Sequence, residues 1–129
     1  MGKNVFTDDV PDTNYNQSWI GDANIFPQKL RIGFSCPKMI RSVKMRNSRR
    51  SPYYNTKDFE IKVREPNSTQ WTDFISGTLS SPFAQDPAPL ETFNGTAVIA
   101  KEIEFSCLST ISPTWYSNRK CALNFIGFA

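Results

Sequence analysis

Residues 43–63 read VKMRNSRRSPYYNTKDFEIKV, and apolar side chains occupy alternate positions on both sides of a polar loop. A period of two places such side chains on one face of a half-buried β-strand. The stretch therefore predicts two strands joined by a loop that is rich in arginine and tyrosine. The alternating apolar residues are Val43 and Met45 before the loop and Phe59, Ile61 and Val63 after it.

The same alternation recurs through the chain, and no helical period persists in any segment. Ile40 falls one position out of phase with Val43 and Met45, which predicts a β-bulge between them. Proline-bearing turn signals, such as Cys36-Pro37, separate the strand patterns. Many short strands without a helix predict an all-β sandwich or barrel. The strand patterns cover residues 29–36, 39–47, 58–65, 96–109 and 121–129.

The length and composition fit one domain that spans residues 1–129. A chain of 129 residues is long enough for a single hydrophobic core. No window holds the roughly 18 consecutive apolar residues that a membrane-spanning helix needs. The N-terminal segment MGKNVFTDDV lacks the apolar stretch of a signal peptide, so we expect none within this chain.

The charge distribution is uneven although the net charge is only +3. Residues 29–62 hold ten of the fifteen basic residues but only two acidic ones. Such a stretch either solvates alternating strand faces or forms a surface that meets anionic headgroups. The net charge is too small to predict a nucleic-acid partner.

The chain contains no histidine, which removes the commonest general base and the usual Ser-His and Cys-His nucleophile pairs. Glu102 and Glu104 share one strand face, but many solvated pairs do the same. No glycine-rich phosphate loop accompanies them. We therefore predict that the protein is not an enzyme and that it needs no cofactor.

The motifs around the opening stretch resemble those of the discoidin, or coagulation factor V/VIII type C, family. In that family a strand ends in Arg-Asn, a loop follows, and Thr-Lys-Asp-Phe opens the next strand; residues 46–47 and 56–59 match this element. A Trp-Thr pair follows a short turn, as it does at residues 71–72. The resemblance covers about residues 4–129. Supporting segments are NVFTDDVPDTNYNQSWIG at 4–21, LRIGFSCPKMIRSVKM at 30–45 and LNFIGF at 123–128.

The resemblance implies an antiparallel jelly-roll sandwich with the galactose-binding-like fold. Members are mainly non-catalytic modules that hold carbohydrates, anionic phospholipids or proteins on loops at one end of the sandwich. The family's usual first strand, about twenty residues before the Asn4 segment, has no counterpart. The chain either lacks that strand or closes its sheet differently.

The resemblance also bears on calcium. Many relatives bind a structural calcium ion with a glutamate at the position that Phe125 occupies here. Calcium prefers six to eight oxygen ligands, often from carboxylates. With that glutamate missing, the remaining candidates for a calcium site are Asp8, Asp9 and Asp12.

Two polar segments carry the candidate ligand-binding residues. Sugars are held by aromatic rings that stack on their apolar faces and by planar polar groups that bond their hydroxyls, and anionic headgroups call for Arg and Lys. An exposed tryptophan such as Trp115 suggests an interaction surface, although it could instead fold back onto the sandwich. The candidates are Arg46, Arg49, Arg50, Tyr53, Tyr54, Trp115, Tyr116 and Arg119.

Other polar and aromatic residues receive structural roles. Local bonds from side chain to backbone by Asn47, Thr56 and Asp58 are expected to fix the first segment. Trp19 and Trp71 are predicted to lie in the core.

Three cysteines leave at least one thiol unpaired unless it bonds another chain. Cys36 and Cys107 both fall on inward strand positions, where free thiols pack as small hydrophobes. Cys107 and Cys121 flank Trp115 and could staple that segment, and Cys121 could also bond a second chain. The sequence leaves the pairing open.

Three Asn-x-Ser/Thr triplets begin at Asn16, Asn67 and Asn94, all in predicted loops. Such triplets are acceptors for N-glycosylation on surface loops of secreted proteins. They favour an extracellular or cell-surface location.

These observations together predict a lectin-like or cell-adhesion module that binds carbohydrate through loops at one end. The alternatives are a module that binds anionic phospholipid membranes and one that binds only protein, including an oligomer linked by a cysteine.

Overall fold

The computed structural model of the chain describes residues 19–21, 24–47, 55–80, 89–111, 119–123 and 125–129. Within these ranges every regular element is a β-strand and every strand pair is antiparallel, which confirms the predicted all-β architecture. None of the described residues forms a helix long and apolar enough to cross a membrane. The strands are β1 (Trp19–Ile20), β2 (Gln28–Arg46), β3 (Asp58–Arg64), β4 (Trp71–Thr78), β5 (Glu91–Cys107), β6 (Ala122–Leu123) and β7 (Phe125–Phe128).

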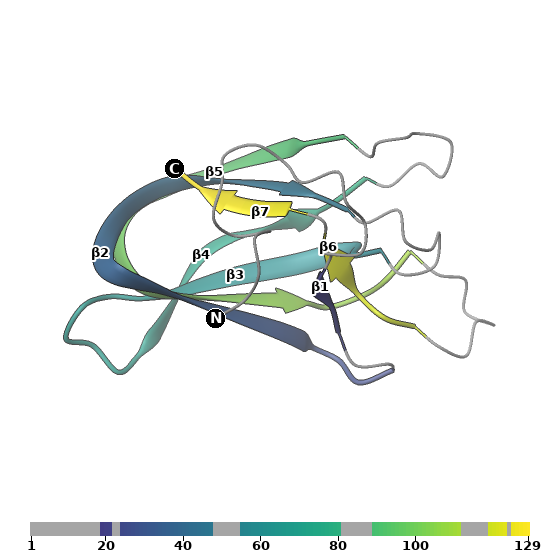
Figure 1. Cartoon of the computed structure of the whole chain (residues 1–129), viewed down its shortest axis with the longest axis horizontal. Helices are drawn as coiled ribbons and strands as arrows, with labels where there is room; N and C mark the ends of the chain where they lie inside the picture. Colours follow the sequence, from purple (N-terminus) through teal and green to yellow (C-terminus); the bar gives the residue numbers. More distant parts are fainter. Residues whose placement is uncertain (1–18, 22–23, 48–54, 81–88, 112–118, 124) are drawn as a thin grey trace.

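Two long, bent strands contribute to both layers of the sandwich (Figure 1). Residues 28–33 of β2 pair with residues 102–107 of β5, and residues 38–45 of β2 pair with residues 91–100. Strands β3 and β4 extend the first layer from β5, whereas β7 extends the second layer from β2. The two layers therefore face each other although hydrogen bonds join them in the order β4-β3-β5-β2-β7. A separate pair, β1 with β6, adds a short second sheet.

The bend comes from extra residues in β2. Residues 34–37 lie opposite a single residue of β5, Lys101, because the pairing jumps at this point. The Lys101 ammonium donates to the carbonyl oxygens of Phe34 at 2.9 Å and Ser35 at 3.2 Å. It thus bonds backbone acceptors where the strand ladder is interrupted.

Sequence predictions near the bend have mixed outcomes. The register shift between Ile40 and Ser42 confirms the predicted bulge. The predicted turn at Cys36-Pro37 is wrong, because β2 continues through it. The inward position predicted for Cys36 is also wrong, because the three extra residues break the alternation and leave an exposed free thiol.

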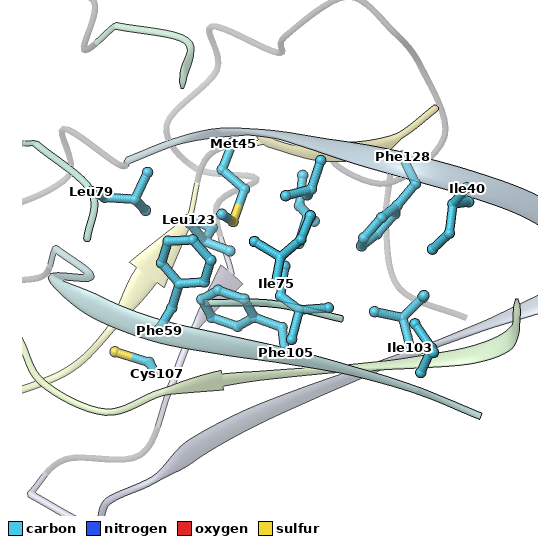
Figure 2. Packing of buried hydrophobic residues seen from close by; sticks show 14 of the residues in the cluster. Ile40, Met45, Phe59, Ile75, Leu79, Ile103, Phe105, Cys107, Leu123 and Phe128 are labelled. Carbon is cyan, nitrogen blue, oxygen red and sulfur yellow. The ribbon is translucent and has the colours of Figure 1, made fainter. Parts of the chain in front are cut away.

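The core fills the space between the two layers. Figure 2 shows Met45 on β2 and Phe128 on β7 facing Phe59 and Phe105 of the opposite layer. The rings of Phe59 and Phe105 are stacked with centroids 6.0 Å apart, and Trp19 meets Phe105 edge-on at 5.8 Å. The predicted inward phases of β3 and of the end of β5 are confirmed. Trp19 is only partly buried and packs against the core from its edge.

The outer face of the first layer carries cross-strand ion pairs. Glu104 on β5 bonds Arg31 at 2.9 Å and lies 3.5 Å from the Lys29 ammonium. The core position predicted for Trp71 is wrong. Trp71 pairs with Arg64, which follows the inward-facing Val63 and so points outward, and Trp71 therefore lies on the outer face. There the Arg31 guanidinium covers its ring at 5.3 Å.

The two ends of the sandwich differ. Figure 1 shows β2 and β4 ending, and β3 and β5 beginning, at one end, which we call the loop end. The opposite end holds the bends of β2 and β5 and the turn between β3 and β4, and we call it the bend end.

Candidate functional site

Asn47 joins the two sides of the first predicted binding segment, between residues 47 and 56, at the loop end. Its Nδ2 donates to the carbonyl oxygen of Thr56 and its Oδ1 accepts from the backbone N–H of Thr56, both at 3.0 Å. The same Nδ2 lies 3.5 Å from the carbonyl oxygen of Ser80, where the next connection starts. Asn47 is 1% exposed, so solvent does not compete for these bonds. This confirms the structural role expected for Asn47 and Thr56.

The start of the second predicted segment is bonded to the base of the first. Lys57 N donates to Ser109 O at 2.9 Å, Ile111 N donates to Asn55 O at 3.1 Å, and Thr56 forms a bridge with Thr110. The Thr56 hydroxyl also donates to Ala122 O at 2.9 Å, where the second segment ends. Both segments therefore start and end at the same end of the sandwich.

A disulfide between Cys107 and Cys121 closes the second segment. The two Cα atoms are 6.4 Å apart, and both residues are buried. This pairing resolves the alternatives that the sequence leaves open: Cys107 is not a free thiol, and Cys121 bonds within the chain. The covalent closure fixes both ends of the segment that contains Trp115, Tyr116 and Arg119.

The turn between β1 and β2 holds the backbone of Arg119. Asn24 N donates to Arg119 O at 2.9 Å, and Arg119 N donates to Asn24 Oδ1 at 3.0 Å. Asn24 adopts a φ of 61°, a left-handed conformation that asparagine tolerates better than most residues. The Arg119 guanidinium lies over the Phe26 ring, 5.8 Å from its centroid.

Gln28, the first residue of β2, is buried and bonds the segment that contains Arg119 and Cys121. Its Nε2 donates to Arg119 O at 3.2 Å, and its Oε1 accepts from Cys121 N at 2.8 Å. Gly21 donates from its N–H to Cys121 O at 2.9 Å, and a Cβ at Gly21 would lie 2.2 Å from Gln28 Oε1. Any larger residue at position 21 would therefore displace the Gln28 amide and break its hydrogen bonds. A cavity of about 210 Å³ opens beside this contact, lined by Trp19, Ile20, Gly21, Ile25, Pro27, Gln28 and Lys29.

Asp58 links β3, β4 and the segment that follows β5 beside the same base. It accepts hydrogen bonds from the Thr78 hydroxyl at 2.7 Å and the Ser109 hydroxyl at 3.0 Å. These bonds, first that of Thr78 and then that of Ser109, lower the pKa of Asp58, and the charge of Lys57 acts in the same direction. Asp58 therefore stays ionised, and its expected role in fixing the base is confirmed.

Two of the eight predicted ligand-binding residues lie within the described residues. Arg119 lies at the loop end with its backbone bonded as above, and Arg46 ends β2 there with only 5% exposure. Both come from the same end of the sandwich, although burial puts Arg46 at the base of its segment. The other six, Arg49, Arg50, Tyr53, Tyr54, Trp115 and Tyr116, lie outside the described residues.

The described residues do not offer the calcium site that the resemblance suggests. They contain no group of three or more cysteine or acidic side chains able to hold a metal ion. Phe125 is 1% exposed, so an apolar ring packs where relatives carry the glutamate. The candidates Asp8, Asp9 and Asp12 lie outside the described residues.

The two carboxylates that share a strand face, Glu102 and Glu104, are engaged in ion pairs. Glu102 pairs with Arg64, and Glu104 pairs with Arg31 and Lys29 on the outer face. This arrangement gives a structural account of both residues.

Sequence reasoning missed Asn24 and Gln28, which hold Arg119 from the neighbouring turn. Asn24 gave a usable signal, because an asparagine in a polar stretch before a strand is typical of a left-handed turn position. Gln28 gave none, because its burial depends on Cys121, 93 positions away in the sequence.

Comparison with known proteins identifies the family of this chain. The family model described as the F5/8 type C domain matches residues 4–124. A search of curated proteins returns no match.

Solved structures with a similar fold include three family 32 carbohydrate-binding modules. The module of AlyQ in complex with 4,5-unsaturated mannuronic acid has a TM-score of 0.66 and 18% identity, covering 92% of this chain and 81% of that one. A Clostridium perfringens module in complex with GalNAc-β-1,3-galactose has a TM-score of 0.69 and 14% identity, covering 89% and 76%. The C. perfringens NanJ module in complex with galactose has a TM-score of 0.67 and 16% identity, covering 89% and 77%. These likenesses confirm the predicted jelly-roll fold.

Proposed function

The chain belongs to the F5/8 type C domain family, and from that premise we propose that it is a non-catalytic module that binds carbohydrate at the loop end. The observation that carries the proposal is the hydrogen-bonded base shared by the two predicted segments. Thr56 contacts both Asn47 and Ala122, so residues between 47 and 56 and residues between 111 and 122 extend from one place.

The side chains supplied by these segments suit a sugar. Tyr53, Tyr54 and Trp115 provide rings for stacking, and Arg49 and Arg119 provide planar donors for hydroxyl or carboxylate oxygens. Arg46 has a supporting role in this proposal, because it is buried at the base.

The structural neighbours support this ligand class. The three modules bind galactose, a GalNAc-galactose disaccharide and an unsaturated mannuronic acid in their complexes. We extend the proposal to a lectin-like or adhesive role in an extracellular or cell-surface protein.

Glycan-array screening followed by calorimetric titration with galactose, GalNAc-β-1,3-galactose and a mannuronate oligosaccharide tests this function. Arg119→Ala is expected to weaken binding roughly tenfold, since a hydrogen bond from a charged group contributes about 1.5–3 kcal/mol. Arg31→Ala is the matched control, because Arg31 also covers an aromatic ring but lies on the outer face. Absence of binding at millimolar sugar by the folded wild type would overturn the proposal.

Liposome co-sedimentation separates the phospholipid alternative. Binding to phosphatidylserine vesicles that weakens with salt, without sugar binding, would favour it. The pairing of Lys29 and Arg31 with Glu104 counts against that alternative, because these cations are partly neutralised on the outer face.

A further inference from the structure

Two of the three Asn-x-Ser/Thr triplets lie within the described residues, and their backbone settings differ. Asn67-Ser68-Thr69 lies in the turn between β3 and β4, whereas Asn94-Gly95-Thr96 lies inside β5. The prediction that Asn94 lies in a loop is therefore wrong. Both asparagines are exposed, so the difference between them is in the backbone.

Asn67 occupies a tight, local turn. Ser68 N donates to Glu65 O at 3.2 Å, which makes Pro66 and Asn67 the two central residues. Proline at the first central position and a φ of 64° at Asn67 fit a type II turn. Further bonds also stay within the turn: Arg64 donates to Ser68 O at 2.8 Å, and Gln70 N donates to the Ser68 hydroxyl at 3.2 Å.

Asn94 has a different environment. It pairs with Ser42 beside a register shift of the β2–β5 ladder, and the neighbouring Gly95 packs against β4. A Cβ at Gly95 would lie 2.8 Å from the Ile75 side chain and 3.2 Å from Phe74 O. An enzyme that needs the Asn94 backbone in its own cleft must compete with this pairing and packing. The turn at Asn67 carries no such long-range constraint in its hydrogen bonds.

We infer that Asn67 is an N-glycosylation site and that the protein matures in a secretory compartment. Three features of the molecule support this assignment: the acceptor triplet at Asn67, its exposed turn made by local bonds, and the disulfide between Cys107 and Cys121 elsewhere in the chain. Disulfides form and persist in oxidising compartments, which include the site of N-glycosylation in the secretory pathway. The turn lies at the bend end, so the glycan leaves the loop end accessible (Figure 1).

The transfer uses an oligosaccharide linked to a lipid pyrophosphate as co-reactant. The Asn67 amide nitrogen forms a bond to the anomeric carbon of the first sugar, and the bond from that carbon to the pyrophosphate oxygen breaks. The lipid pyrophosphate leaves with the bonding electron pair, and the amide gives up one proton. No electrons are exchanged with an oxidant.

Secretion of the full chain from cultured insect cells behind a cleavable signal tests the inference. We expect site-resolved peptide mass spectrometry to find a glycan on Asn67 and treatment with an N-glycan amidase to increase gel mobility. Thr69→Ala, which keeps Asn67 and its turn, should abolish the glycan. Thr69→Ser, which restores the triplet, should keep it, and Asn94→Gln, the matched control, should leave modification of Asn67 unchanged.

The folded state of each secreted variant is checked by its melting temperature, so that loss of the glycan is not confused with misfolding. An unmodified Asn67 in the secreted wild type would overturn the inference, whether or not another triplet is modified. A glycan that persists on Thr69→Ala would overturn it as well.

Discussion

The loop end and the bend end of the sandwich hold the backbone in different ways. At the loop end, buried side chains bond the backbone directly: Asn47 bonds residues 56 and 80 in two separate segments, and Gln28 bonds Arg119 and Cys121 in a third. A disulfide adds a covalent link there. At the bend end, a partly exposed Lys101 bonds two carbonyl oxygens, and the strands themselves carry the chain around.

This difference fits the demands on each end. A binding surface made of irregular segments needs a base that does not depend on the segments themselves, because their side chains are selected for the ligand. The bend needs only the β2–β5 pairing on either side of it, which continues on both sides of the interruption. We therefore expect substitutions at the base of the loop end to have larger effects than substitutions at the bend end.

Removal of the disulfide is expected to have the largest effect. Cys107→Ser with Cys121→Ser should lower the free energy of unfolding by about 3 kcal/mol, because the bridge closes a loop of roughly 15 residues in the unfolded chain. Urea denaturation measures the loss. Cys36→Ser is the matched control, because Cys36 is exposed and free. Equal stability of the double variant and the control would contradict the importance of the bridge.

Asn47→Ala should have the next largest effect. It leaves the buried N–H and carbonyl of Thr56 without these partners, which costs about 1–3 kcal/mol. Chemical denaturation measures the stability, and sugar titration measures whether binding falls with it. Asn47→Asp keeps the acceptor for Thr56 N but not the donor, so an intermediate stability is expected. Full stability of Asn47→Ala would show that the base does not depend on this amide.

Substitutions at Asn24 separate the contribution of backbone conformation to stability from that of hydrogen bonding. Asn24→Ala loses the Arg119 contact and must adopt a left-handed φ, which costs alanine about 1–2 kcal/mol. Asn24→Gly loses only the side-chain contact, and Asn24→Asp keeps an acceptor oxygen for Arg119 N. We expect stability in thermal denaturation to fall in the order wild type, Asp, Gly, Ala. Glycine below alanine would contradict the role assigned to φ.

The sequence predicted the strands well, because alternation is a local signal. The inward faces of β3 and of the end of β5 follow directly from period two, and the phase of Ile40 located a bulge. The same rule failed at Cys36, where three extra residues in β2 reset the phase. The core position expected for Trp71 came from the family pattern and not from alternation; it failed because Trp71 pairs with Arg64 on the outer face.

The base of the candidate site was predicted only in part. Asn47, Thr56 and Asp58 belong to a recognisable motif, so their structural roles could be expected. The partners of that motif, Ser109 and Ala122, are 51 and 66 positions away from the residues they bond. Contacts over such separations are set by how the layers close, and one sequence contains no local sign of them.

The pH dependence of stability tests whether Asp58 contributes to the base through its charge. Because hydrogen bonds from Thr78 and Ser109 lower its pKa in the folded protein, its contribution is complete above the pKa of the unfolded chain. That contribution is lost as the pH falls below about 4 and passes through the lowered folded pKa. We expect the melting temperatures of wild type and Asp58→Asn to differ at pH 5 and to converge towards pH 2. Thr78→Val should reduce this convergence, whereas a difference that stays constant with pH would contradict the assignment.

Lys101→Met should have the smallest effect, and it tests the bend end directly. The ammonium bonds two carbonyls at a partly exposed position, where water can take its place, so a loss within about 0.5 kcal/mol is expected. Urea denaturation measures the stability, and sugar titration should show unchanged affinity because the site lies at the other end. A loss as large as that of Asn47→Ala would mean that the bend, too, depends on a single side chain. The two ends would then differ in the chemistry of their contacts but not in their importance for the fold.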